Sequence, residues 1–137
     1  MLINELTERA IGACIEVHKQ TGPGLLESTY RRCLCRELTL RGIPFQCEVP
    51  LPVCYKGELI DCGYRIDVLI DGRLVLELKS VEKLVAIHEA QLLTYLRLGN
   101  WQIGLLINFN VEVLRLGIKR IVNGLPERAS APSAPRR

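Results

Sequence analysis

The chain has 137 residues and a formal net charge of +3, a size that suits one domain with a single core. Hydrophobic residues make up 48% of it and charged residues 24%, as in soluble globular proteins. No apolar run approaches the ~20 residues that span a bilayer, and the N-terminal segment carries acids where a signal peptide would be apolar. We therefore exclude a membrane-spanning helix and expect a cytoplasmic protein with no membrane partner.

The basic excess lies partly in the last twelve residues, where three Arg accompany one Glu. The rest of the chain holds 15 basic and 14 acidic residues, so net charge does not identify a polyanionic partner, and a nucleic-acid surface would need local clustering. Residues 126–137 are rich in Pro, Ala and Ser. They predict a disordered tail behind a single domain of residues 1–125.

Two helices are predicted at the start of the chain. In residues 4–20 apolar side chains recur at helical spacing, Asn4 can cap the first turn, and the TGPG sequence at residues 21–24 ends the helix. A second helix is predicted from about residue 25 to residue 40, because apolar residues again share one face and Gly42 follows.

Three strands are predicted next. Residues 45–55 alternate between apolar and polar side chains, which indicates a strand, and Pro50 and Pro52 favour an edge position or a bulge. After a Lys-Gly turn, a second strand is expected over about residues 59–70. The third is expected over residues 73–79, beyond an Asp-Gly turn.

The remaining elements are a helix over about residues 84–98 and two strands, over about residues 102–108 and 112–116. The predicted order is ααβββαββ. This order favours an α/β (α+β) fold in which helices pack on one sheet.

The strand at residues 73–79 carries two charges in an otherwise aliphatic run. Glu77 and Lys79 share one face with Val75, although isolated buried charges are costly. Asp67 lies on the preceding strand, so two carboxylates and an ammonium group can converge. Carboxylate and carbonyl oxygens suit Mg²⁺, and a neighbouring lysine can orient or deprotonate an attacking water. The pattern indicates a magnesium site for phosphodiester chemistry.

The length of the Asp-Gly loop decides whether this site can form. A two-residue loop would pair Asp67 with Leu76 and leave Glu77 on the opposite face of the sheet. A loop of three residues puts Asp67 and Glu77 on the same face. The interpretation therefore predicts a loop with an odd number of residues.

Four sequence blocks together resemble the PD-(D/E)XK nuclease superfamily. Asp67 and the Glu77-Leu78-Lys79 run resemble its D…(D/E)xK signature, and residues 24–30 (GLLESTY) resemble the GxxExxY motif of one of its families. The segments 88–95 and 106–109 resemble later blocks of that family. The resemblance implies a mixed four- to five-stranded sheet flanked by helices in the order αβββαβ. The elements predicted for this chain agree with that order and add a helix in front and a strand behind.

The resemblance also implies roles for the residues of the signature. Asp67 and Glu77 would bind Mg²⁺, with Mn²⁺ as the alternative, and the backbone carbonyl of Leu78 would be a third ligand. Lys79 would position or activate the water. Ile66 stands where the superfamily name has proline, but only the acid at the next position takes part in the chemistry.

Other polar residues have a functional and a structural interpretation. Glu27 is either a further, water-mediated metal ligand or an acid that interacts with a helix dipole; Tyr30 shares its helix face. Gln91 and Tyr95, with His88 on the same face, resemble a pattern that holds DNA beside the metal, or they are buried polar groups. Substrate positioning is the role expected of Gln91, Tyr95, Tyr30 and His88, and of Arg65, which could contact a phosphate or pair with an acid.

We consider three hypotheses. The first is a Mg²⁺-dependent nuclease or nuclease-like phosphodiesterase acting on nucleic acid, with DNA preferred. The second is a binding module for nucleic acid or protein that keeps the nuclease fold without catalysis. The third is a structural ion pair between Lys79 and the two acids. A homodimer through the edge strand or the last hairpin stays open.

Overall fold

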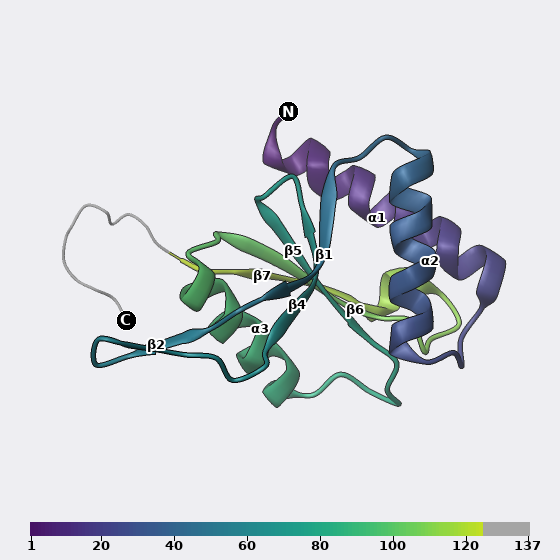
Figure 1. Ribbon diagram of the computed structural model, residues 1–137. Coiled ribbons are helices and arrows are strands. Elements are labelled where there is room, and N and C mark those ends of the chain that lie inside the picture. The colour runs from purple at the N-terminus through teal and green to yellow at the C-terminus, as the bar shows by residue number, and fades with distance from the viewer. Residues whose placement is uncertain (125–137) are drawn as a thin grey trace.

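The computed structural model describes residues 1–124, which form a mixed sheet covered by helices on both faces (Figure 1). The five strands of this sheet within the described residues lie in the order β1-β4-β5-β6-β7. The elements in chain order are α1 (Ile3–Thr21), α2 (Glu27–Leu40), β1 (Phe45–Pro50), β2 (Val53–Tyr55), β3 (Glu58–Ile60), β4 (Arg65–Ile70), β5 (Leu74–Lys79), α3 (Ala86–Gly99), β6 (Ile103–Asn108), a 3₁₀ helix (Leu114–Gly117) and β7 (Ile118–Val122).

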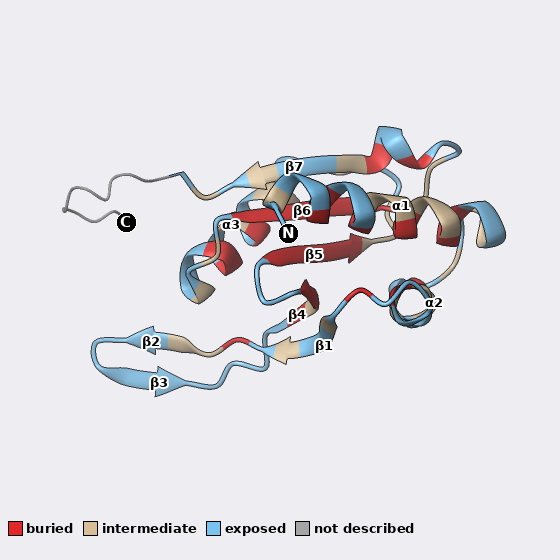
Figure 2. Cartoon of the chain, turned by 90° about the horizontal axis from the view of Figure 1, so that it is seen from above, coloured by how far each residue is buried: buried red, intermediate tan, exposed pale blue. Residues whose placement is uncertain are grey.

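The strand β5 lies at the centre of the sheet. It pairs antiparallel with β4 and parallel with β6, to which it is connected through α3. Because helices cover both faces of the sheet, β5 and β6 are buried almost throughout (Figure 2). This burial explains why both strands are nearly continuous aliphatic runs rather than alternating ones.

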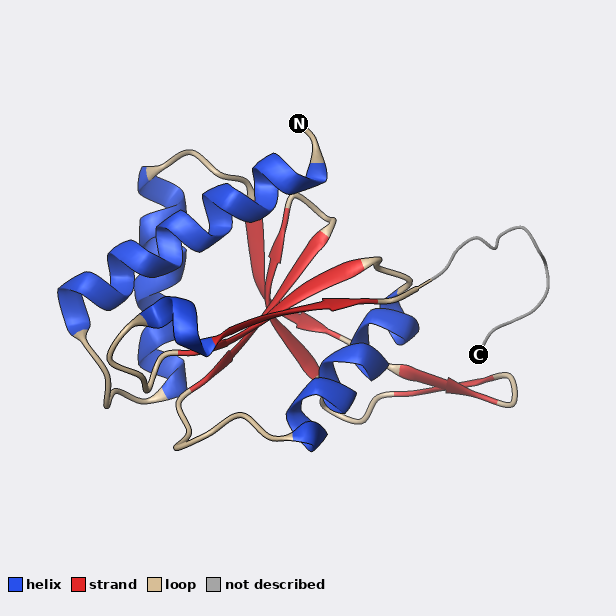
Figure 3. Cartoon of the chain, turned by 180° about the vertical axis from the view of Figure 1, so that it is seen from behind, coloured by secondary structure: helices blue, strands red, loops and turns tan. Residues whose placement is uncertain are grey.

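Two hydrophobic clusters lie on opposite faces of the sheet. Leu34 and Leu76 belong to a cluster with residues of α1 and α2, whereas Val75, Leu92 and Leu106 belong to a cluster with residues of α3. Figure 3 shows α1 and α2 on one side of the sheet and α3 on the other. Neighbouring residues of β5 therefore face different helices, as the alternation in a strand requires.

The predicted strand over residues 45–55 is wrong in extent. β1 ends at Pro50, and residues 53–55 form β2, which pairs with β3 in a separate hairpin that projects from the body (Figure 2). Two prolines around Leu51 remove backbone donors at this point, which divides the strand. The predicted edge position is confirmed, because β1 is the outermost strand beside β4.

Two further strand predictions need correction. The strand expected over residues 59–70 is divided into β3 and β4, with Gly63 at a positive φ of 77° in the connection. The strand expected over residues 112–116 is wrong: a 3₁₀ helix ends at Gly117 and β7 begins only at Ile118. A side chain at Gly117 would collide with the Asn108 carbonyl, so the chain turns tightly there before it pairs with β6.

The three helices of the described residues confirm the predicted helices to within two residues at each end. With the β2–β3 hairpin treated as an insertion, the observed order of sheet strands and helices is the predicted ααβββαββ. Within residues 1–124, no helix has both the length and the apolar character needed to cross a membrane. The predicted tail at residues 126–137 lies outside the described residues.

Candidate metal centre and active site

Asp67 and Glu77 lie opposite each other where the ladder between β4 and β5 ends. The loop between the strands consists of residues 71–73, and Val68 opposite Leu76 is the last paired position. Continuing this register places Asp67 opposite Glu77. The three-residue loop confirms the prediction of an odd loop length, so the two carboxylates share one face of the sheet.

Beyond the last backbone pair, the side chains of Asp67 and Glu77 form the hydrogen bonds between β4 and β5. Glu77 Oε1 accepts the N–H of Asp67 at 3.2 Å, and Asp67 Oδ2 accepts the N–H of Leu78 at 2.8 Å. Within residues 1–124, the second oxygen of each carboxylate accepts no hydrogen bond. Each carboxylate is thus oriented by one backbone donor and keeps one oxygen for a ligand.

Burial and mutual repulsion disfavour the charged form of this pair. Glu77 is 6% exposed, and burial, followed by the charge of Asp67, raises the pKa of Glu77 to about 8. Burial also raises the pKa of Asp67, against the opposing effects of the Leu78 N–H and the Arg31 charge. A divalent cation would remove this repulsion, because it favours the ionised form of both groups.

Lys79 lies two residues beyond Glu77 on the face of the sheet that α3 covers. Its Nζ donates a hydrogen bond to Gln91 Oε1 at 3.3 Å. Gln91 is exposed on α3, and Tyr95, one turn further along, is 7% exposed. Burial and then the Glu77 charge raise the pKa of Tyr95. The structure therefore brings Gln91 and Tyr95 to the acid–lysine cluster, as the sequence predicts.

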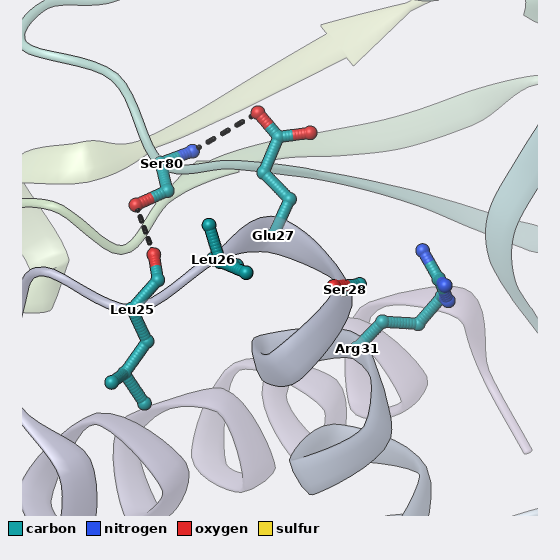
Figure 4. A pocket seen from close by; sticks show the side chains of 6 residues that line it. All are labelled: Leu25, Leu26, Glu27, Ser28, Arg31 and Ser80. Carbon is teal, nitrogen blue, oxygen red and sulfur yellow. Dashed lines mark hydrogen bonds between the residues drawn. The ribbon is translucent and has the colours of Figure 1, made fainter.

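Glu27 approaches the carboxylate pair from the start of α2. Its Oε2 accepts the Ser80 N–H at 3.4 Å (Figure 4), and its charge contributes to the raised pKa values of Asp67 and Glu77. Among residues 1–124, however, no three His, Cys, Asp or Glu side chains form a group that could hold a metal. Glu27 therefore does not join Asp67 and Glu77 in a three-carboxylate metal site. Its expected role as a water-mediated metal ligand stays a prediction.

Tyr30 is wrong as a substrate-positioning residue. It is fully buried, its ring stacks on Phe109 with a centroid distance of 4.4 Å, and its hydroxyl donates to the Gly22 carbonyl at 2.6 Å while accepting the Leu25 N–H at 3.1 Å. Since no part of Tyr30 is exposed, it cannot contact a substrate. It instead fixes the loop that leads into Glu27.

The substrate-positioning roles of His88 and Arg65 stay predictions. His88 Nδ1 accepts the Val85 N–H at 3.0 Å, a local bond at the start of α3. Arg65 is exposed at the first position of β4, but strand alternation does not place it beside Asp67. Ile66 packs on the α3 side and Val68 on the other side, so the regular alternation breaks at Asp67.

Two residues of this region were not among the predicted site residues. Arg31 Nη1 lies 3.7 Å from Asp67 Oδ1; its position four residues after Glu27 on a helix was the available signal. Asn108 is buried, and its side chain donates to the Val81 carbonyl at 2.9 Å and accepts the Val81 N–H at 3.0 Å. Asn108 thereby holds the segment that follows Lys79.

The donor set fits a hard divalent cation. Within residues 1–124 each carboxylate has one oxygen that accepts no hydrogen bond, although Asp67 Oδ1 also lies 3.7 Å from Arg31 Nη1. The Leu78 N–H points to Asp67. Because the N–H and C=O of a strand residue point to the same side, the Leu78 carbonyl also faces the β4 side. Oxygen ligands of this kind suit Mg²⁺, which keeps several waters and needs few protein ligands.

A mixed sheet with helices on both faces, and an Asp, a Glu and a Lys at the ends of two adjacent strands, define a protein of the nuclease fold. The model of the PD-(D/E)XK nuclease superfamily matches residues 4–121, so the chain belongs to that superfamily. A search of curated proteins and a search of solved structures each gave no match. The narrower GxxExxY assignment stays a prediction.

Proposed function

We propose that this protein is a divalent-metal-dependent nuclease that hydrolyses phosphodiester bonds of nucleic acid, with Mg²⁺ or Mn²⁺ as cofactor and DNA as the preferred substrate. The observation that carries the proposal is the buried pair Asp67–Glu77, oriented by two cross-strand hydrogen bonds and followed by Lys79. The pair does not favour folding, because burial raises the pKa of both carboxyl groups and their ionised forms are therefore costly in the folded protein.

Asp67, Glu77 and the Leu78 carbonyl would hold the cation. When bound, the cation supplies Lewis-acid polarisation of the phosphoryl group. Lys79, whose Nζ is held by Gln91, donates a hydrogen bond to the attacking water and orients it. Water adds to phosphorus and releases a proton to the solvent, the bond between phosphorus and the leaving oxygen breaks, and that oxygen takes up a proton from the solvent. The products are a phosphomonoester and a hydroxyl end.

The test compares the wild type with Lys79→Ala and Glu77→Ala on labelled single- and double-stranded DNA and RNA, with Mg²⁺ or Mn²⁺. Glu89→Ala is a matched control, because its carboxylate pairs with Lys119 on the surface. We expect cleavage by the wild type and the control, and a loss of about 10²–10⁴-fold in Lys79→Ala. Calorimetry should show that Glu77→Ala no longer binds the metal while Lys79→Ala still does.

Cleavage that is equal in all four proteins would come from a contaminant and would refute the assignment of Lys79 and Glu77. Absence of cleavage, together with binding of nucleic acid by the wild type, would favour the alternative of a non-catalytic binding module. The balanced charge of residues 1–125 favours that alternative slightly, but the loss of a signature residue would have favoured it more, and none of the three is lost.

A further inference from the structure

A pocket opens beside the carboxylate pair, between the start of α2 and the end of β5. Its volume is about 480 Å³, and it is lined by Leu25, Leu26, Glu27, Ser28, Arg31 and Ser80 (Figure 4). Glu27 reaches across one side of it to Ser80. Arg31 is the cationic residue of the lining and also approaches Asp67. The pocket therefore adjoins the proposed metal ligands.

The guanidinium of Arg31 is held loosely between two acids. Its nitrogens lie 3.4 Å from Glu48 Oε2 and 3.7 Å from Asp67 Oδ1, although its side chain is only 21% exposed. A tight charge-assisted hydrogen bond would measure about 2.7–2.9 Å, as Arg41, the residue that follows α2, forms with Glu37 at 2.7 Å. Arg31 thus retains donors that neither acid fully uses.

Glu48 marks an irregular point of the sheet directly opposite Asp67. Its φ is 51°, an uncommon conformation for a residue other than glycine. The ladder between β1 and β4 pairs Cys47 with Val68 and Val49 with Ile66, but omits Glu48 with Asp67. Such backbone strain is often found at functional sites. Here it accompanies the placement of a second carboxylate beside Arg31.

We propose that Arg31 binds a phosphate of the nucleic-acid backbone and positions it beside Asp67 and Glu77; this inference rests on the proposed nuclease function. The site is rich in acids, so a polyanion needs cationic groups to approach it. Lys79 is hydrogen-bonded to Gln91. Among the described residues, Arg31 is the other cationic side chain that lies against the acids of the site. Its planar set of donors matches the oxygens of a phosphate.

The competing explanation is that Arg31 only neutralises Asp67. Under that explanation, removing Arg31 changes the stability of the protein and the protonation of Asp67, but not the number of phosphates that the protein contacts. Under the proposal, Arg31 forms an ion pair with one phosphate, so its loss lowers the salt dependence of binding. The salt dependence therefore separates the two roles.

The experiment measures binding of short DNA oligonucleotides, single- and double-stranded and labelled at the 3′ end, by fluorescence anisotropy in Mg²⁺. All proteins are full-length and carry Lys79→Ala, which prevents cleavage during the measurement. Arg31→Gln is compared with Arg31→Lys and with Arg32→Gln, a matched control because Arg32 is the next residue and is exposed. Thermal unfolding checks that each variant is folded. If Arg31→Gln is unfolded, the affinity loss of Arg31→Lys relative to Arg32→Gln provides the test.

We expect Arg31→Gln to weaken binding roughly tenfold or more and to lower the slope of log K against log salt by about 0.7–0.9. Arg31→Lys should restore the slope and part of the affinity, because it keeps the charge but not the planar donors. Arg32→Gln should change the affinity less than twofold. A loss confined to oligonucleotides with a 5′-phosphate would identify a terminal phosphate as the ligand, and a loss in all oligonucleotides would identify an internal one.

Equal effects of Arg31→Gln and Arg32→Gln, or an unchanged salt slope in Arg31→Gln, would refute the role of Arg31 and leave the proposed function intact. Absence of binding of any oligonucleotide by the Lys79→Ala protein with Arg31 in place would refute this inference, whereas the proposed function is refuted separately, by the cleavage assay of the wild type.

Discussion

Replacing Glu77 with glutamine should make the metal-free protein more stable at neutral and alkaline pH, although Glu77 is proposed to be essential for activity. Glutamine has nearly the same shape, and its amide oxygen can still accept the Asp67 N–H that Glu77 accepts. The substitution removes the charge, which burial and the facing Asp67 carboxylate disfavour. We therefore expect it to relieve an electrostatic cost without opening a cavity.

The magnitude follows from the pKa of Glu77, which burial raises from 4.5 to about 8. Between these values the folded protein holds a proton that the unfolded chain has lost, so the free energy of unfolding falls as pH rises. The loss begins near pH 4.5 and is complete just above pH 8. At about 1.4 kcal/mol for each tenfold change in proton affinity, the whole loss is on the order of 5 kcal/mol.

The assay is urea unfolding in EDTA at several values between about pH 5 and pH 9. The fluorescence of Trp101 reports on it, because this single tryptophan packs against the cluster on the α3 side. The difference between Glu77→Gln and the wild type should grow with pH by several kcal/mol. Glu89→Gln should change stability by less than about 1 kcal/mol at every pH, as expected of a surface pair. Parallel curves for the wild type and Glu77→Gln would refute the argument.

Two further predictions concern the residues that support the site. Tyr30→Phe should destabilise the protein by about 1–3 kcal/mol, because the partly buried Gly22 carbonyl loses its hydroxyl donor; equal urea midpoints for variant and wild type would contradict this. Asn108→Ala should cost about 2–4 kcal/mol, since it removes both hydrogen bonds to Val81, and amide exchange at Val81 should become faster. Unchanged exchange at that amide would show that the segment after Lys79 is held by other contacts.

The sequence predicted the centre of the fold better than its margins. β5 and β6 were predicted to within a residue, because both are buried on two faces and therefore aliphatic throughout. In residues 112–116 polar and apolar side chains alternate as in a strand. The segment instead leads into a 3₁₀ helix, because Gly117 must pass close to the Asn108 carbonyl. This contact between residues that are apart in the sequence cannot be predicted from the local periodicity of the side chains.

The same limit applies to the site. Asp67, Glu77 and Lys79 could be predicted because each is a charge within an apolar strand, and a three-residue loop follows from placing the two acids on one face. Arg31 was missed because its approach to Asp67 depends on how α2 packs across the sheet. Its spacing from Glu27 places it on the same helix face but does not show what that face contacts.

The position of the carboxylates links the stability of the protein to metal binding. At neutral pH Glu77 holds a proton, since burial raises its pKa to about 8, and a cation must displace that proton to bind both acids. Metal affinity should therefore rise about tenfold per pH unit below pH 8 and level off above it. Calorimetry of Mn²⁺ binding in buffers of different ionisation enthalpy would measure the released proton. Binding without proton release near pH 7 would mean that Glu77 is already ionised, and would contradict the electrostatic argument for this site.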